Sequence, residues 1–309
     1  MSEPLRFSDV LRIVEARTKI VGASSVLIGT AYAAWLARRV DWPVFALMLG
    51  GTLAVDLGTA GFNSYFDFVR GVDTVETDVD RYKVLVHRAV DPRIALWIAW
   101  AAFGLAGAFG LALGARVGGE VIGVGVGCMV VAYLYSGGPR PIAATPLGEL
   151  FSGGLLGLLL VTLAAYVQGR SIPAHAALVG LPSALLIADI LTVNNTCDRV
   201  GDAAAGRTTL SILLGARGSL ALITGLSAAA YVLALGLAAS RVLPLVSLPL
   251  LTAGALFAAR ELGRMHRRGY THRTKGASMG SISTIFLTYT AAILGGLVLD
   301  ALATTETLS

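Results

Sequence analysis

The sequence predicts an all-α fold, a multi-pass transmembrane bundle of about nine helices, and three observations point to it. Hydrophobic residues make up 55% of the 309-residue chain and charged residues only 14%, whereas soluble domains carry about 25% charged residues. The apolar runs are long enough to cross a hydrocarbon core of about 30 Å, which takes about 20 helical residues. They are also continuous, unlike the short alternating strands of a transmembrane barrel. The lipid bilayer is therefore the expected partner of this chain.

Nine apolar runs are each expected to form one span. They cover residues 19–37, 43–65, 93–114, 119–136, 147–168, 173–193, 216–239, 242–260 and 279–303. We expect residues 19–303 to form a single transmembrane domain, followed by a C-terminal tail, 304–309. The preceding segment, 1–18, is polar and amphipathic. One face of an interfacial helix there is expected to carry Leu5, Val10, Leu11 and Val14.

The basic residues predict the orientation of the chain. With the N-terminus inside, 19 of the 24 Lys and Arg residues fall on the side of the N-terminus and of the loops after the even-numbered spans. The positive-inside rule therefore predicts a protein of the cell membrane whose N-terminus and even-numbered loops are cytoplasmic. Topology accounts for the net charge of +5, so no nucleic-acid partner is expected. Cys128 and Cys197 form neither a disulfide framework nor a metal-binding spacing.

Two clusters of acids and amides interrupt the apolar pattern. The first, "GFNSYFDFVRGVDTVETDVDRYK" at 61–83, follows the second span, and the other, "NNTCDRVGDAAAGRTTL" at 194–210, follows the sixth. Both clusters lie at the predicted cytoplasmic ends of their helices. They are four spans apart, which suggests two related halves.

The spacing of the acids predicts a metal site. Residues four apart share one face of a helix, and like charges there repel, so these carboxylates need a cation. Oxygen-only ligands suit Mg²⁺, which is usually held by one or two carboxylates together with waters and substrate phosphates. The sequence thus predicts a Mg²⁺–diphosphate site. The expected ligand faces are Asn63 and Asp67 in the first cluster, and Asn194, Asp198 and Asp202 in the second.

Basic residues near the clusters fit a diphosphate leaving group, because they offset charge that a metal leaves uncovered. In the first cluster and after it they are Arg70, Arg81, Lys83 and Arg88; in the second and after it they are Arg199 and Arg207. Arg70 and Arg199 could equally be topology signals. For the later run "RELGRMHRRGYTHRTK" at 260–275, topology is the favoured interpretation over catalysis.

At three places the sequence resembles the UbiA superfamily of intramembrane prenyltransferases. "NSYFDFVRGVDT" at 63–74 is similar to the family's first Asp-rich motif, and "NNTCDRVGDAAAGRTTLSILLG" at 194–215 to its second. Between them, "YSGGPRPIAATPLGELFSGGLLG" at 135–157 resembles the central segment of the 1,4-dihydroxy-2-naphthoate polyprenyltransferase branch of menaquinone synthesis. The resemblance implies nine helices around a central cavity that opens sideways to lipid for a long prenyl tail.

The resemblance also implies roles for individual residues. Mg²⁺ would bridge the diphosphate and the two motifs through Asn63, Asp67, Asp198 and Asp202. Besides Asp67 and Asp198, the catalytic set includes Lys83, the basic residue after the first loop, and Tyr135, which lines the cavity. The expected substrate-binding set is Asn63, Arg70, Asp73, Arg81, Asn194, Asn195, Arg199 and Arg207.

The expected activity is transfer of a prenyl group from a polyprenyl diphosphate to an aromatic acceptor of the dihydroxynaphthoate kind, through an allylic cation. The alternative is a UbiA-type terpene cyclase that needs no acceptor. It stays open because Ser64 stands where the family usually has Asp, and Cys197 where the naphthoate branch usually has Arg. A secondary transporter fits less well, since transport sites usually lie near the membrane midplane.

Overall fold

The computed structural model describes residues 6–15, 19–75, 83–88 and 90–306, and over these residues every regular element is helical. The all-α prediction is confirmed. The α-helices are α1 (Phe7–Ile13), α2 (Ile20–Ala37), α3 (Trp42–Val69), α4 (Val84–His87), α5 (Pro92–Val117), α6 (Glu120–Ser136), α7 (Gly148–Ser152), α8 (Leu160–Gly169), α9 (Ala176–Ala204), α10 (Leu210–Ala239), α11 (Ser247–Arg268) and α12 (Lys275–Glu306). Shorter elements are the 3₁₀ turns η2 (Ile142–Ala144) and η4 (His272–Thr274) and the π-helix η3 (Gly153–Leu159).

Seven helical segments in the described part of the chain are long and apolar enough to cross a membrane. They correspond to seven of the nine predicted spans, with α7, η3 and α8 forming one continuous segment. The other two predictions, 119–136 and 242–260, fall on α6 and α11. With 17 residues, α6 is a shorter apolar helix. The 22 residues of α11 begin later than predicted. Arg260, Glu261 and Arg264 lie inside the helix, before its basic last turn, so α11 is too polar to count among the seven segments.

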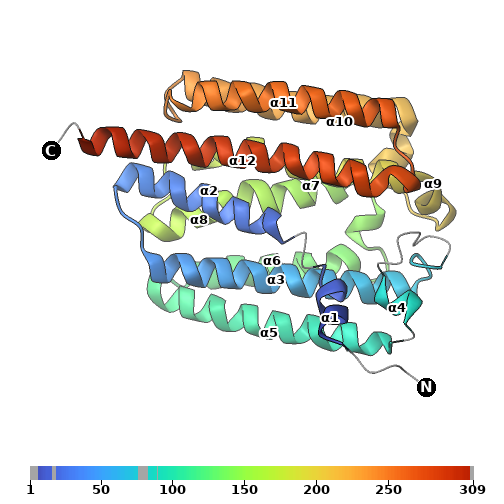
Figure 1. Cartoon of the computed structure of the whole chain (residues 1–309). Helices are drawn as coiled ribbons and strands as arrows, with labels where there is room; N and C mark the ends of the chain where they lie inside the picture. The colour runs from blue at the N-terminus through green and yellow to red at the C-terminus, as the bar shows by residue number, and fades with distance from the viewer. Residues whose placement is uncertain (1–5, 16–18, 76–82, 89, 307–309) are drawn as a thin grey trace. The chain divides into compact units, whose positions relative to one another are not determined.

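The fold divides into two compact units. Unit 1 comprises residues 1–23, 46–148 and 200–209, and unit 2 comprises residues 24–45, 149–199 and 210–309. Within unit 1, α5 packs along α6, and within unit 2, α11 packs against both α10 and α12 (Figure 1). Each unit contains part of the predicted site: the first acidic cluster belongs to unit 1, and the second is divided between residues 194–199 in unit 2 and 200–209 in unit 1.

An aromatic cluster forms the core of unit 1. Phe62 of α3 is fully buried, and its ring makes edge-to-face contacts with Trp100, Phe103 and Tyr133, at centroid distances of 5.0, 5.0 and 5.2 Å. Such pairs favour this geometry because the positive ring edge meets the negative face. Phe66, one helical turn further on, lies 6.0 Å from Tyr133. The cluster fixes the face of α3 next to the one that carries the first acids.

The N-terminal helix α1 belongs to unit 1, and its packing differs in detail from the prediction. Ile13 and Val14 are buried, whereas Leu11 is exposed. An ion pair between Asp9 and Arg88 ties α1 to the end of α4, and the pair is almost buried on the Asp9 side. The helix is therefore docked through its polar residues as well as its apolar ones, which a search for an apolar face cannot detect.

In unit 2 the π-helix lies very close to α9. A Cβ atom added at Gly157 would lie 2.3 Å from the Cα of Ala184, and one at Gly153 would lie 2.3 Å from the carbonyl oxygen of the same residue. Glycine at both positions is thus a requirement of packing. At Gly154 an added Cβ would meet no atom within 4 Å.

We expect Gly157→Ala to destabilise the protein, and Gly154→Ala in the same π-helix to be tolerated. The first substitution forces α9 and η3 apart, and overpacking of this kind typically costs about 1–3 kcal/mol. Thermal unfolding in detergent, followed by intrinsic fluorescence, measures both variants. Equal unfolding temperatures for the two would show that the close contact does not contribute to stability.

Candidate active site

The first acid-bearing helix ends in a turn that fixes the backbone of Asp67. Helix α3 ends at Val69, and Gly71 follows with a positive φ of 69°. The amide of Gly71 donates to the carbonyl of Phe68 (3.1 Å), and the amide of Val72 donates to the carbonyl of Asp67 (2.9 Å). This pair of bonds is a Schellman motif, which needs a left-handed residue and so selects glycine.

The second acid-bearing helix ends in the same way. Gly206, with φ of 75°, follows the end of α9. Its amide donates to the carbonyl of Ala203 (3.1 Å), and the amide of Arg207 donates to the carbonyl of Asp202 (2.9 Å). In both helices the acid therefore lies four residues before the glycine, and the chain turns back immediately after it. In the second turn, the residue that turns back is an arginine.

Arg207 joins acids from the two predicted motifs. Its guanidinium contacts a carboxylate oxygen of Asp67 at 2.6 Å and one of Asp202 at 3.4 Å. The three side chains are 8–16% exposed, so solvent screens the interactions only weakly. The backbone of the next residue, Thr208, also donates to the carbonyl of Ala144 (2.9 Å), which holds this loop in unit 1. Unit 1 thus places two carboxylates, 135 positions apart in sequence, around one cation.

Asn63 and Arg70 connect α3 to the end of α6. The side-chain oxygen of Asn63 accepts a hydrogen bond from the hydroxyl of Ser136 (3.1 Å). Arg70 donates to the carbonyls of Ser136 (2.5 Å) and Gly138 (2.6 Å), and its guanidinium lies 4.9 Å from the ring centre of Phe66. These carbonyls lie at the C-terminal end of α6, where backbone carbonyls have no intrahelical partner. Arg70 therefore caps α6, and its contact with a diphosphate stays a prediction.

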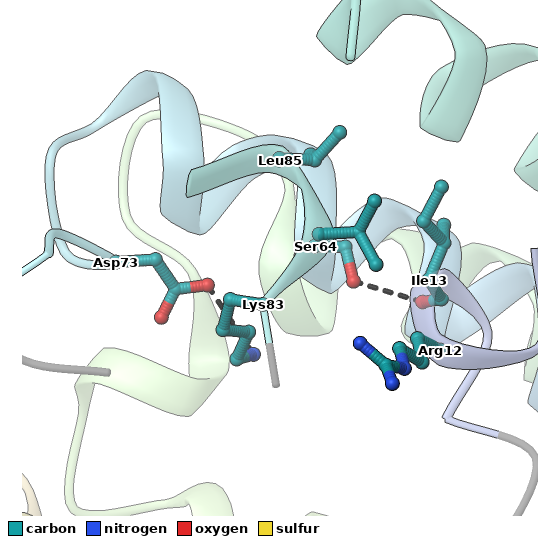
Figure 2. Close-up of a pocket in the computed structure, with 7 residues that line it drawn as sticks. Arg12, Ile13, Ser64, Asp73, Lys83 and Leu85 are labelled. Carbon is teal, nitrogen blue, oxygen red and sulfur yellow. Dashed lines mark hydrogen bonds and ion pairs between the residues drawn. The ribbon is translucent and has the colours of Figure 1, made fainter. Parts of the chain in front are cut away.

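A small pocket lies beside the first cluster in unit 1 (Figure 2). Asp73 and Lys83 form an ion pair across it at 3.2 Å. Ser64 donates its hydroxyl hydrogen to the carbonyl oxygen of Ile13 (2.8 Å). The serine at the position of the family's usual acid thus binds the end of α1. The lining is completed by Arg12, Ile13, Val84 and Leu85.

Lys83 is charged throughout the physiological pH range. Burial alone would lower the pKa of its ammonium group, but the carboxylates of Glu15, Asp73 and Asp67 outweigh burial and raise the pKa well above its ordinary value of 10.5. Glu15 lies 3.5 Å from the ammonium nitrogen. Because the pKa is raised, the stabilisation from this charge is complete below pH 10.5 and is lost only as the pH rises through the folded-state pKa.

We therefore expect Lys83→Met to slow the prenyl transfer expected from the sequence, and by the same factor at pH 6.5 and at pH 9. Loss of one charged hydrogen-bonding group should slow turnover by about 10- to 100-fold. Steady-state rates at the two pH values, each divided by the wild-type rate, provide the measurement, and Lys83→Arg is the charge-preserving control. A penalty that vanished at pH 9 would mean that Lys83 has already lost its proton there.

The second cluster has partners of its own in unit 2. One carboxylate oxygen of Asp198 lies 2.9 Å from Nδ1 of His272, and the other is bound by the ammonium group of Lys275. Both partners lie in the segment 270–275, which the sequence alone marked as a topology signal. A His and a Lys three residues apart can face the same way on a helical turn. That spacing is the signal that could have identified them, because the positive-inside rule does not require it.

Asn195 leads to a second residue that sequence reasoning missed. Its side-chain amide donates to Glu149 at 2.9 Å. Glu149 is 4% exposed, and its other carboxylate oxygen has no hydrogen-bond partner. Of the remaining predicted residues, Asn194 and Arg199 are partly buried on α9, Tyr135 is partly buried in the last turn of α6, and Arg81 lies outside the described residues.

Comparison with known proteins gives the family. Residues 24–282 match the UbiA prenyltransferase family. The chain belongs to this family. The UbiA resemblance inferred from the Asp-rich motifs is thus confirmed, and the protein is a prenyltransferase with several membrane-spanning helices.

Relatives within the UbiA family indicate the branch. The chain is 37% identical over 212 residues to the 1,4-dihydroxy-2-naphthoate octaprenyltransferase of Bacillus subtilis, covering 69% of this chain and 68% of that one. It is 31% identical over 217 residues to the enzyme of the same name from Mycobacterium tuberculosis, covering 70% and 73%. Among solved structures, a UbiA homologue from Archaeoglobus fulgidus bound to DMAPP and Mg²⁺ superposes with a TM-score of 0.63 at 17% identity. The alignment covers 93% of this chain and 99% of that one, and it shows a shared fold.

The donor set of this UbiA-family site suits Mg²⁺. In unit 1 the available ligands are an amide oxygen from Asn63 and carboxylates from Asp67 and Asp202, and both carboxylates already converge on one cationic group. The described residues contain no group of three or more His, Cys, Asp or Glu side chains that could hold a metal by themselves. Two carboxylates with waters and a diphosphate are the set that Mg²⁺ prefers, whereas a closed protein cage would suit other metals better.

Proposed function

We propose that this prenyltransferase moves a polyprenyl group from its diphosphate to an aromatic acceptor of the 1,4-dihydroxy-2-naphthoate type, in a Mg²⁺-dependent reaction. The observation that carries the proposal is the convergence of Asp67 and Asp202 on Arg207 in unit 1. It supports a site in which both Asp-rich motifs act together. The naphthoate branch is supported by the names of the Bacillus and Mycobacterium relatives.

The residues that would hold Mg²⁺ are Asn63, Asp67, Asp198 and Asp202. When bound, the ion would neutralise charge on the diphosphate as the leaving group departs. Arg207 and Lys83 supply fixed positive charge, which stabilises an anion as charge develops on it. Both are held by acids of the site, so their ammonium and guanidinium groups need little reorganisation when the substrate arrives.

The aromatic side chains of unit 1 suit the other half of the reaction. Loss of diphosphate leaves an allylic cation on the prenyl chain, and the faces of Phe66 and Tyr133 can stabilise it electrostatically. Apolar walls exclude the water that would otherwise capture it. An electron-rich carbon of the acceptor then forms the new carbon–carbon bond, and the acceptor loses a proton.

We place the reaction at the cytoplasmic side of the cell membrane. The distribution of Lys and Arg supports a cytoplasmic N-terminus, and the loops after α3 and α9 then face the same side. Both acid-bearing helices end at this side, where a soluble acceptor and pyrophosphate can enter and leave while the prenyl tail stays in lipid.

A product assay with purified protein tests the proposal. Geranylgeranyl and longer prenyl diphosphates are supplied with Mg²⁺, with and without dihydroxynaphthoate. We expect a prenylated naphthoquinol and released pyrophosphate only when both substrates are present. A hydrocarbon product without acceptor would identify a cyclase instead. If pyrophosphate were released only with an aromatic acceptor other than the naphthoate, the proposed acceptor would be wrong.

A further inference from the structure

We propose that Lys275 and His272, which Asp198 holds in place, form a diphosphate-binding element. This inference rests on the proposed Mg²⁺–diphosphate site and extends it to the segment 270–275, which neither Asp-rich motif contains. The argument needs only unit 2, because α9 residue Asp198 and both basic residues belong to it.

Both carboxylate oxygens of Asp198 contact a basic side chain. Oδ1 lies 2.9 Å from Nδ1 of His272, and Oδ2 is bound by Lys275. A divalent ion that binds Asp198 must take at least one of these oxygens and adds positive charge beside Lys275. The metal ion and the Lys275 ammonium group would then share one carboxylate, and two positive charges so close together repel. Metal binding therefore weakens the interaction of Asp198 with its basic partners.

The released side chains stay at the site because the backbone that carries them is fixed. The side-chain hydroxyl of Thr274 donates to the carbonyl of Gly269 (2.8 Å), and the amide of Thr271 donates to that same hydroxyl (2.9 Å). His272 and Lys275 therefore keep their places. Each is about one-third exposed, at 38% and 31%, so an incoming ligand can reach them.

A diphosphate is the anion that fits this situation. It arrives with the metal, carries several negative oxygens, and accepts charge-assisted hydrogen bonds from an ammonium and an imidazole group. Lys275 would then exchange the Asp198 carboxylate for a phosphate oxygen when Mg²⁺ and the prenyl diphosphate bind. Lys275 is the principal ligand in this proposal, because its ammonium group offers three hydrogen-bond donors on a flexible side chain.

The exchange predicts opposite effects on two ligands when Lys275 is replaced by methionine. Mn²⁺, used as a probe for Mg²⁺ and measured by the EPR signal of the free ion without substrate, should bind Lys275→Met about threefold more tightly, because a competing cation is gone. Inorganic pyrophosphate, measured by calorimetry at saturating Mg²⁺, should bind about tenfold or more weakly, because a charged hydrogen bond is lost. Lys275→Arg should restore most of the pyrophosphate affinity.

Arg273→Met is the matched control, because it removes one charge from an exposed side chain in the 3₁₀ turn that directly precedes Lys275. It should leave both affinities near the wild-type values. Pyrophosphate affinity unchanged in Lys275→Met would overturn the inference, and so would a parallel loss of Mn²⁺ and pyrophosphate binding, which indicates a merely structural role. These assays need neither acceptor nor turnover. If they behave as expected while no naphthoate is prenylated, the proposed acceptor is wrong and the inference stands.

Discussion

Replacing Asp67 by asparagine should reduce the rate of prenyl transfer by about 10²–10³-fold, the range seen when one group that stabilises a developing charge is removed. The substitution keeps the shape of the side chain and the Schellman turn after it. It removes the negative charge that binds Arg207 at 2.6 Å and that would help to hold Mg²⁺. Product formation under saturating substrate gives the rate, and thermal unfolding in detergent reports whether the variant is folded.

Asp91→Asn is a suitable control for this experiment. Asp91 is exposed and accepts a hydrogen bond from the amide of Arg93 at the start of α5, and asparagine caps helices about as well as aspartate. The control should therefore keep its rate. If a folded Asp67→Asn protein kept the wild-type rate, Asp67 would not be a metal ligand.

Replacing Arg207 by alanine should lower the unfolding temperature much more in EDTA than in millimolar Mg²⁺. Without the arginine, Asp67 and Asp202 lose the cation that they share, although Lys83 and Arg70 still act on the charge of Asp67. Breaking a fully buried pair costs about 3–5 kcal/mol, and the cost here should be smaller because 16% of the Arg207 side chain is exposed. Mg²⁺ can replace the lost charge, so the protein should gain more stability from the metal than the wild type does.

The double variant Asp67→Asn/Arg207→Gln separates charge from packing. It removes one positive and one negative charge together, so its unfolding temperature in EDTA should recover most of the loss seen in Arg207→Ala. Its transferase activity should remain low, because the metal ligand is gone. If Mg²⁺ gave wild type and Arg207→Ala the same shift in unfolding temperature, the ion would not bind between these acids.

Hydropathy alone predicted the spans well but not their polar ends. The sixth span was expected to stop at residue 193, whereas α9 continues to Ala204 and contains the whole second acidic cluster. An apolar window cannot detect such an extension. Side-chain contacts outside the helix maintain it there: Asp198 binds the distant segment 270–275, and Asp202 binds Arg207, just after the helix ends.

The candidate site was predicted where its residues form short periodic patterns. The i,i+4 spacing identified Asp67, Asp198 and Asp202, and it placed each on the acid-bearing face of its helix. His272 and Lys275 were not predicted, because their contact with Asp198 joins positions more than seventy residues apart. Glu149 was not predicted either, because a single acid at the start of an apolar run resembles a cap residue. Arg70 shows the opposite case: its sequence position suggests a ligand contact, while its donors bind carbonyls at the C-terminal end of α6.

The twin Schellman endings make the acids independent of the loops that follow them. In each helix the carbonyl of the acid itself is bound by the amide of the residue after glycine, so the backbone of Asp67 and Asp202 is fixed before either loop begins. Segments downstream of Val72 and of Arg207 can therefore be exchanged between homologues at those junctions without shifting the register of the carboxylates. Acceptor preference could diverge by such exchanges while the chemistry at the diphosphate stays constant.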